Sequence, residues 1–130
     1  MIVMAIWHGE KGRKKTGGKI KIARKKKKRE LGSFPTYTKL GAEKRRTVTG
    51  KYGIKKTKLY SAEFANVLDP DSKSIKKVKI LDVVENPADT QFVRRKIITK
   101  GAIIKTELGL ARVTSSPGQH GIINAVLVKK

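Results

Sequence analysis

The chain has 130 residues, with 32 Lys and Arg against 10 Asp and Glu, a formal net charge of +22 and no cysteine. A chain of this length forms one domain, with at most an added segment that does not fold alone. The lack of cysteine excludes disulfides, thiolate metal sites and cysteine nucleophiles, and it suits a reducing compartment. No apolar run approaches the roughly 20 residues of a membrane-spanning helix, and the first six residues are too short for a signal peptide. We therefore expect a soluble protein that is not exported.

The positive charge points to the class of partner. A net charge of +22 on 130 residues opposes compaction, because like charges repel unless a polyanion neutralises them. Nucleic acid is the most abundant intracellular polyanion, and Lys and Arg side chains bind it by displacing counterions from its phosphates. The composition therefore predicts a nucleic-acid-binding protein.

Charge and apolar bulk are divided unequally along the chain. Residues 1–58 carry 20 Lys and Arg against 3 Asp and Glu, whereas residues 59–130 carry 12 against 7. The first segment has 10 Ile, Leu, Val and Phe residues and the second has 24, so only the second has the composition of a sizeable core. We predict a basic RNA-binding extension over residues 1–45 and a compact domain over residues 46–130.

The densest positive charge lies in residues 11–29, where 12 of 19 residues are Lys or Arg. We call this segment the basic run. It cannot form a core of its own, so we expect it to become ordered only when phosphates neutralise it, with residues 22–31 able to form a short helix at that point. A solvated tail or a localisation signal is the simpler reading of a basic segment, but the density of charge favours binding to a polyanion.

The predicted RNA-binding residues follow from side-chain chemistry. Lys provides point charges, Arg provides forked contacts to phosphate, and glycine allows the backbone to approach a phosphodiester chain closely. Trp7 either stacks on a base or anchors the extension to the domain. The predicted contacts are Arg13, Lys14, Lys15, Thr16, Gly17, Gly18, Lys19, Arg24, Lys25, Lys26, Lys27, Lys28, Arg29, Arg45 and Arg46; Arg94, Arg95 and His120 are weaker candidates.

The second part of the chain has the pattern of an all-β fold. Short segments rich in β-branched residues are separated by Asp-Pro, Asn-Pro, Lys-Gly and Pro-Gly turns. The predicted strands cover residues 46–49, 56–60, 75–85, 92–99, 102–106, 110–114 and 122–128. This spacing favours a small antiparallel β-barrel of about six strands, or a sandwich, with no long helix.

Strict alternation in residues 75–85 predicts which side chains face the core. The pattern places Val78, Ile80 and Val84 on one face, together with Asp82. Leu81 and Val83 then belong to the opposite face.

Signals for catalysis are weak. The two histidines, His8 and His120, lie far apart in the sequence and lack the clustered acidic residues of a metal site. The segment 115–120 (SSPGQH) lacks the small-Ser-small pattern of a hydrolase, and residues 12–19 have the wrong glycine spacing for a phosphate-binding loop. We expect no enzyme activity, no metal and no cofactor.

Several motifs in this chain resemble one known family. Trp7-His8, the segment 13–19 (RKKTGGK) and the segment 28–32 (KRELG) are similar to the N-terminal signature of the eight-e family of small-subunit ribosomal proteins, shared by archaea and eukaryotes. The segments 38–41 (TKLG), 80–84 (ILDVV) with Asn86, Val93-Arg94 with Lys96, 97–104 (IITKGAII) and 116–121 (SPGQHG) follow in the family's order. The resemblance covers nearly the whole chain from Met4, and the short length is similar to archaeal members.

The resemblance implies a structural component of the small ribosomal subunit in the cytoplasm. Its partners would be small-subunit ribosomal RNA, with the 5′ domain of that RNA as the expected location, and neighbouring ribosomal proteins. It also implies a β-barrel with a basic N-terminal extension threaded into the RNA. Residues 1–3 precede the start that resembles the family, so we assign them no function.

Three other classes of protein remain open from the residues alone. A chromatin-like DNA-binding protein would have similar charge, and binding that prefers folded ribosomal RNA to duplex DNA would separate the two. A peptide for membrane surfaces is disfavoured because Ile20 and Ile22 are the main apolar residues amid the lysines. An enzyme of RNA modification is disfavoured by the lack of a cofactor motif.

Overall fold

The computed structural model describes residues 5–128 and divides into two compact units on either side of the bond between Pro35 and Thr36. We call residues 5–35 the N-terminal unit and residues 36–128 the barrel unit. The boundary predicted between residues 45 and 46 lies inside a strand of the barrel unit. The expectation about residues 1–3 falls outside the described residues.

The elements are mostly strands, and the helices are short. None of the helices in residues 5–128 combines the length and the apolar character needed to cross a membrane. In chain order the elements are β1 (Ile6–Trp7), η1 (Lys28–Glu30), β2 (Leu31–Gly32), β3 (Thr38–Leu40), β4 (Lys44–Thr49), η2 (Lys51–Gly53), β5 (Lys55–Ala62), β6 (Phe64–Asp69), β7 (Ser74–Glu85), α1 (Thr90–Arg94), β8 (Ile97–Ile98), β9 (Ile103–Thr106), β10 (Gly109–Val113), α2 (Pro117–His120) and β11 (Asn124–Leu127).

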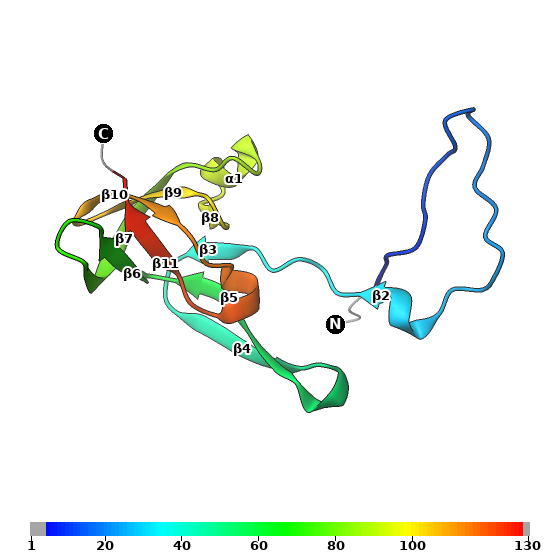
Figure 1. Ribbon diagram of the computed structural model, residues 1–130, viewed down its shortest axis with the longest axis horizontal. Coiled ribbons are helices and arrows are strands. Elements are labelled where there is room, and N and C mark those ends of the chain that lie inside the picture. The colour runs from blue at the N-terminus through cyan, green and yellow to red at the C-terminus, as the bar shows by residue number, and fades with distance from the viewer. Residues whose placement is uncertain (1–4, 129–130) are drawn as a thin grey trace. The chain divides into compact units, whose positions relative to one another are not determined.

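The barrel unit is built around a closed sheet with the strand order β10-β11-β6-β7-β9 (Figure 1). The predicted all-β barrel is therefore confirmed, with five strands. It is not entirely antiparallel, because β11 pairs with β6 in parallel through Asn124 opposite Asn66. A closed ring with an odd number of strands cannot alternate in direction throughout, so one parallel pair is required.

The core fills the barrel with small and branched side chains. Ile104 and Ala111 are completely buried, and Val67 and Val113 are 1% exposed. Leu59 extends this cluster to β5, outside the five-strand ring. Burial of this apolar surface provides the main stabilisation of the barrel unit.

Strand β7 departs from the predicted alternation. Val78 and Ile80 are buried as expected, but Val83 is buried at 4% exposure while Val84 is 49% exposed. Register irregularities in the β7–β9 pairing, between Ile80 and Asp82 and again after Val83, shift which residues face inward. A β-bulge inserts an extra residue and thereby exchanges the two faces beyond it. The prediction that placed Val84 with Ile80 was therefore wrong.

The strand predicted over residues 92–99 is confirmed only at β8 (Ile97–Ile98), because helix α1 occupies its first part. The Asp89 side chain accepts a 2.9 Å hydrogen bond from the backbone N–H of Gln91 and so caps the helix. The buried Asn86 side chain then fixes the chain that follows, donating to the Ile97 carbonyl at 3.2 Å and accepting from the Thr99 hydroxyl at 2.9 Å. Local capping and a buried polar contact therefore outweigh the β propensity of this segment.

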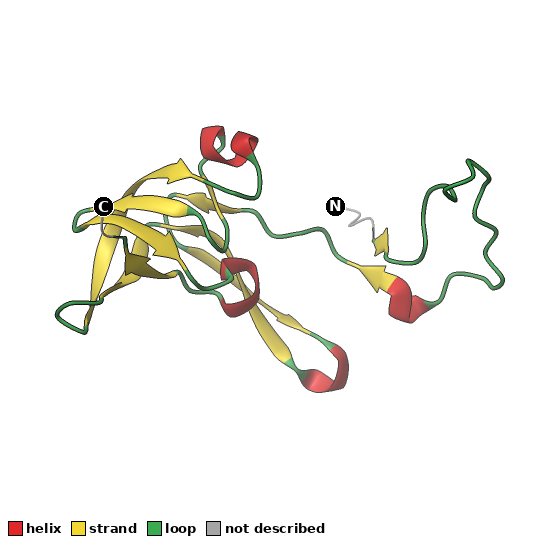
Figure 2. Cartoon of the chain, turned by 45° about the horizontal axis from the view of Figure 1, so that its top comes forward, coloured by secondary structure: helices red, strands yellow, loops and turns green. Residues whose placement is uncertain are grey.

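A second sheet has the order β4-β5-β3-β8. Strands β4 and β5 form a long hairpin that projects from the barrel and ends at η2 (Figure 2). All six residues of β4 are exposed, whereas β5 contributes Leu59 and Ala62 to the core at its far end. The hairpin is therefore rooted in the barrel unit at one end and open to solvent at the other.

Candidate nucleic-acid interface

The N-terminal unit is a long open loop whose two ends are joined by a short antiparallel ribbon. Trp7 lies opposite Leu31 and Ile6 opposite Gly32, and the His8 N–H donates to the Glu30 carbonyl at 2.8 Å. Figure 1 shows the chain between β1 and η1 extending away from this ribbon. None of the residues 5–35 is buried. The ribbon and polar contacts therefore hold this unit together, without a core.

Glu30 is the centre of those polar contacts. Its Oε2 accepts a 2.8 Å hydrogen bond from the Trp7 indole N–H and a 3.2 Å bond from the Lys27 backbone N–H. Its Oε1 makes a close ion pair with the Arg24 guanidinium. One carboxylate thus connects β1, the end of the basic run and η1.

The same contacts hold Glu30 in its charged form. The Trp7 indole N–H, the Arg24 side chain and the Lys27 backbone N–H all donate to its carboxylate and lower the pKa of Glu30 from 4.5 to about 2. Hydrogen bonds to a carboxylate favour the charged form. Glu30 is therefore ionised throughout the physiological range.

Residues 13–19 form a tight turn at the start of the basic run. The backbones of Arg13 and Lys19 pair as an isolated antiparallel β-bridge. The Lys14 N–H donates to the Gly18 carbonyl at 2.9 Å, and the Gly17 N–H donates to the Lys14 carbonyl at 2.9 Å. Gly17 has a φ of +85°, a backbone conformation that L side chains rarely adopt. The Thr-Gly-Gly sequence thus makes a turn that brings several cations together.

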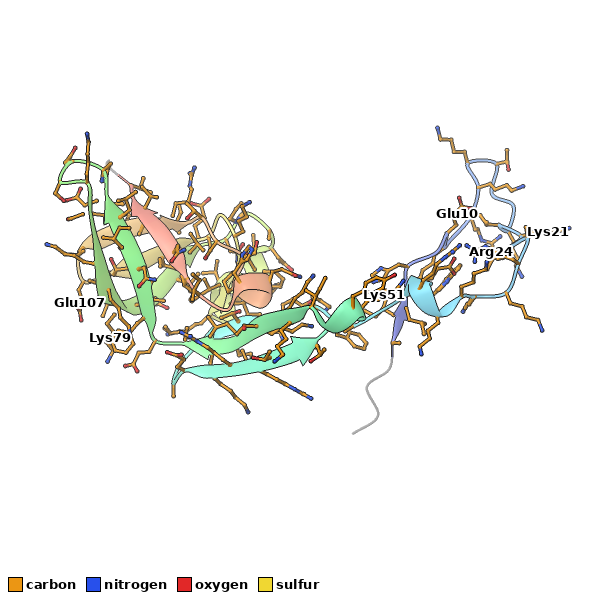
Figure 3. The ribbon with its side chains drawn as sticks, turned by 60° about the horizontal axis from the view of Figure 1, so that its bottom comes forward. Glu10, Lys21, Arg24, Lys51, Lys79 and Glu107 are labelled. Carbon is orange, nitrogen blue, oxygen red and sulfur yellow. The ribbon has the colours of Figure 1, made fainter. Side chains whose placement is uncertain are left out.

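The predicted contacts in the basic run all lie on the surface of the N-terminal unit. Every residue from 11 to 29 is exposed except the half-buried Ile20. Figure 3 shows Lys21 and Arg24 along the loop, together with Glu10. The structure brings Arg13 and Lys14 together with Lys19 at the turn and spreads Lys25, Lys26, Lys27, Lys28 and Arg29 along the extended chain that leads into η1.

A hollow of about 520 Å³ lies inside the loop. Trp7, His8 and Glu30 line it from the ribbon side, and Lys21 and Arg24 line it from the basic run. Its walls therefore combine an aromatic ring and two cations with the carboxylates of Glu10 and Glu30.

Trp7 serves the N-terminal unit itself. Its indole donates to Glu30, and the Lys26 ammonium lies 5.0 Å from the ring centroid, a cation–π arrangement. Both partners belong to the same unit. Neither base stacking nor attachment to the barrel, the two predicted alternatives, is needed to explain these contacts.

Arg45 and Arg46, the two remaining predicted contacts, lie on β4 of the barrel unit. Both are exposed, and Arg45 pairs with Glu43 at 2.6 Å. Among the weaker candidates, Arg94 and Arg95 lie at the end of α1, and His120 is exposed at the end of α2. These residues belong to separate elements and not to the loop of the basic run.

Sequence reasoning missed the structural role of Glu30 and of two glycines beside it. A Cβ on Gly32 would lie 2.0 Å from Nε2 of His8, and one on Gly9 would lie 1.9 Å from Cζ2 of Trp7. The sequence does contain a signal for Glu30, because it is the first acidic residue after a stretch, residues 11–29, that has no Asp or Glu. An isolated carboxylate among so many cations indicates a structural contact.

No group of three or more metal-ligating side chains occurs among residues 5–128. His8 packs over Gly32 in the N-terminal unit, and His120 ends α2 in the barrel unit. The arrangement is suited to binding an extended polyanion along exposed cations.

Comparison with known proteins gives the family of this chain. Residues 7–128 match the family described as Ribosomal protein S8e. The small ribosomal subunit protein eS8 of Methanococcus aeolicus is 50% identical over 128 residues, covering 98% of this chain and all of that protein. The small ribosomal subunit protein eS8 of Sulfolobus acidocaldarius is 50% identical over 131 residues with the same coverage. The chain belongs to the ribosomal protein S8e family.

Proposed function

We propose that this chain is a structural constituent of the small ribosomal subunit in the cytoplasm and that its basic run binds ribosomal RNA. The observation that carries the RNA contact is the exposure of every Lys and Arg from residue 11 to 29, a segment that contains no Asp or Glu. The relatives are named as small-subunit proteins. Membership of the family supports association with ribosomal RNA and with other ribosomal proteins.

The turn at residues 13–19 is the proposed first contact. Arg13, Lys14, Lys15 and Lys19 surround Thr16, Gly17 and Gly18, where the backbone has no large side chain to keep phosphates away. The second contact is the run Arg24, Lys25, Lys26, Lys27, Lys28 and Arg29. Helical RNA hides its base edges in a deep, narrow groove, so this loop would recognise backbone shape where helices meet.

The two parts of the chain would then have different roles in binding. The basic run would supply most of the affinity, and the barrel unit would fix the location on the particle. Neutralising on the order of 6 to 10 phosphates makes binding fall by roughly a thousandfold or more between low and moderate salt. One cationic loop could thereby hold together RNA helices that repel each other, which supports assembly and translation.

Two finer points rest on the family resemblance. We propose the 5′ domain of the small-subunit RNA as the region of contact. We also propose that the chain acts by binding alone, without catalysis, metal or cofactor, since a ribosomal structural family gives no reason to expect turnover.

Sedimentation and crosslinking test this function. A tagged chain should remain in the small-subunit peak of a sucrose gradient in high salt, and crosslinks from residues 11–29 should fall in one region of ribosomal RNA. Loss from the peak, with crosslinks scattered over many RNAs or DNA, would instead indicate a general packaging protein.

A further inference from the structure

The β4–β5 hairpin carries a second concentration of positive charge. Residues 44–60 contain seven Lys and Arg and no Asp or Glu. These cations are Lys44, Arg45, Arg46, Lys51, Lys55, Lys56 and Lys58. By contrast, the β6–β7 hairpin mixes Lys73 with Asp69 and Asp71 around its turn. Apart from Arg45, which pairs with Glu43, the β4–β5 hairpin is therefore one-sided in charge.

The register of the hairpin places cations directly opposite one another. Arg46 pairs with Lys58 and, two residues further along the strand, Val48 pairs with Lys56. Residues that face each other across antiparallel strands share one face of the ribbon, so Arg46, Lys56 and Lys58 lie on the same face. Like charges in opposite positions destabilise a hairpin. A bound polyanion would therefore meet three cations on one face of the ribbon.

The tip presents an aromatic side chain to solvent. Tyr52 is 88% exposed and has a φ of 60°, and the Lys51 ammonium lies 5.2 Å from its ring centroid. A bulky residue at positive φ is a strained conformation, of a kind that clusters at ligand-binding positions. Folding gains little from this ring, since hardly any of it is covered. Its position suits a ligand that stacks on it.

Helix α2 braces the stem of the hairpin. Gly121, which ends α2 with a φ of 74°, packs so closely on β5 that a Cβ there would lie 2.5 Å from Cγ2 of Thr57. The Lys56 ammonium donates to Oε1 of Gln119 at 3.2 Å. The hairpin is thus held in a defined conformation before it meets a ligand, which reduces the entropy lost on binding.

We propose that the β4–β5 hairpin is a second RNA-binding element, in which the Tyr52 ring stacks on an unpaired base and Arg46, Lys56 and Lys58 contact the flanking phosphates. The inference rests on the proposed ribosomal RNA binding and adds a contact with a base to the backbone contacts of the basic run. Aromatic stacking with neighbouring cations is the usual chemistry by which proteins bind unpaired nucleotides.

The test measures binding of the full chain to transcribed small-subunit ribosomal RNA. Tyr52→Ala should weaken binding by roughly 5- to 150-fold, the range found for loss of one stacked base. Tyr52→Phe should bind within about twofold of wild type because it keeps the ring. Tyr52→Asn, which tolerates the positive φ, should fold at least as well as wild type and still lose the affinity. Ile75→Ala, at a residue 70% exposed on β7, is the matched control and should bind normally.

Salt dependence separates the two kinds of contact. Tyr52→Ala should lower affinity equally at all salt concentrations, whereas Arg46→Gln should reduce the slope of log affinity against log salt by about 1. The hairpin proposal is overturned if Tyr52→Ala and Tyr52→Asn bind the RNA as tightly as wild type. The proposed function still stands in that case, provided that wild type binds tightly and variants of the basic run bind weakly. If wild type shows no preference for ribosomal RNA over duplex DNA of equal length, the proposed function itself fails.

Discussion

The indole N–H of Trp7 donates a 2.8 Å hydrogen bond to Glu30, a residue 23 positions later in the chain. This bond closes the loop that contains the basic run, and Arg24 reaches the same carboxylate from within the loop. The N-terminal unit has no buried side chain among its described residues to stabilise it otherwise. The shape in which the cations are presented therefore depends on this carboxylate together with the β1–β2 ribbon.

The pH dependence of the loop follows from this contact. The pKa of Glu30 is lowered from 4.5 to about 2, first by the Trp7 hydrogen bond. A depressed carboxyl pKa contributes stability that is fully present above pH 4.5 and is lost as the pH falls from there through about 2. Trp7 is the chain's one tryptophan, so its fluorescence reports on the loop. We expect its emission to change between pH 4.5 and 2.

Glu30→Gln should abolish that transition, because the amide cannot ionise. Its emission at pH 7 should already resemble that of wild type at low pH. Glu10→Gln removes the same charge from an exposed position and is the matched control. An unchanged pH transition in Glu30→Gln would show that the carboxylate does not hold the loop closed.

The sequence predicted the all-β barrel because β-branched segments and turn residues alternate over short distances. It did not predict the bulged register of β7, because the bulge depends on pairing with β9, which begins 18 residues after β7 ends. The alternation of residue types within β7 gives no sign of this pairing. The capping contact of Asp89 was a local signal, but the apolar residues after it favoured a strand. Glu30 acts through partners that the loop brings together, which no spacing rule reveals.

The register of β7 predicts different effects for two adjacent valines. Val83→Ala should lower the free energy of unfolding by about 2 kcal/mol, because it removes buried methyl groups and leaves a cavity. Val84→Ala should change it by less than about 0.5 kcal/mol, as is usual for an exposed site. Urea denaturation followed by circular dichroism measures both. A larger loss of unfolding free energy in Val84→Ala than in Val83→Ala would favour simple alternation along β7 and contradict the bulge.

Gly121 is predicted to be sensitive to substitution for two reasons. Its φ of 74° disfavours any side chain, and an added Cβ would lie 2.5 Å from Cγ2 of Thr57. Gly121→Ala should therefore lower the free energy of unfolding by about 1 to 3 kcal/mol, measured by denaturant titration. The double variant with Thr57→Ser removes the clashing methyl group and should recover part of that loss. If the loss of unfolding free energy in the double variant equals the sum of the losses in the two single variants, the contact between Gly121 and β5 is unimportant.

Neutralising the turn at residues 13–19 should weaken RNA binding in a salt-dependent way. Arg13, Lys14 and Lys15 are exposed around the turn, so replacing all three with Gln removes up to three phosphate contacts. Each lost contact should reduce the slope of log affinity against log salt by about 1. Filter binding of the full chain to transcribed small-subunit RNA at several salt concentrations gives this slope.

The β6–β7 hairpin offers a control with the same change in charge. Lys73, Lys76 and Lys77 are also exposed, and replacing them with Gln lowers the net charge of the chain by the same amount. If general attraction between a cationic protein and RNA set the affinity, both triple variants would lose slope equally. Because the turn at residues 13–19 combines its cations with Gly17 and Gly18, where phosphates can approach the backbone, we expect the larger loss there.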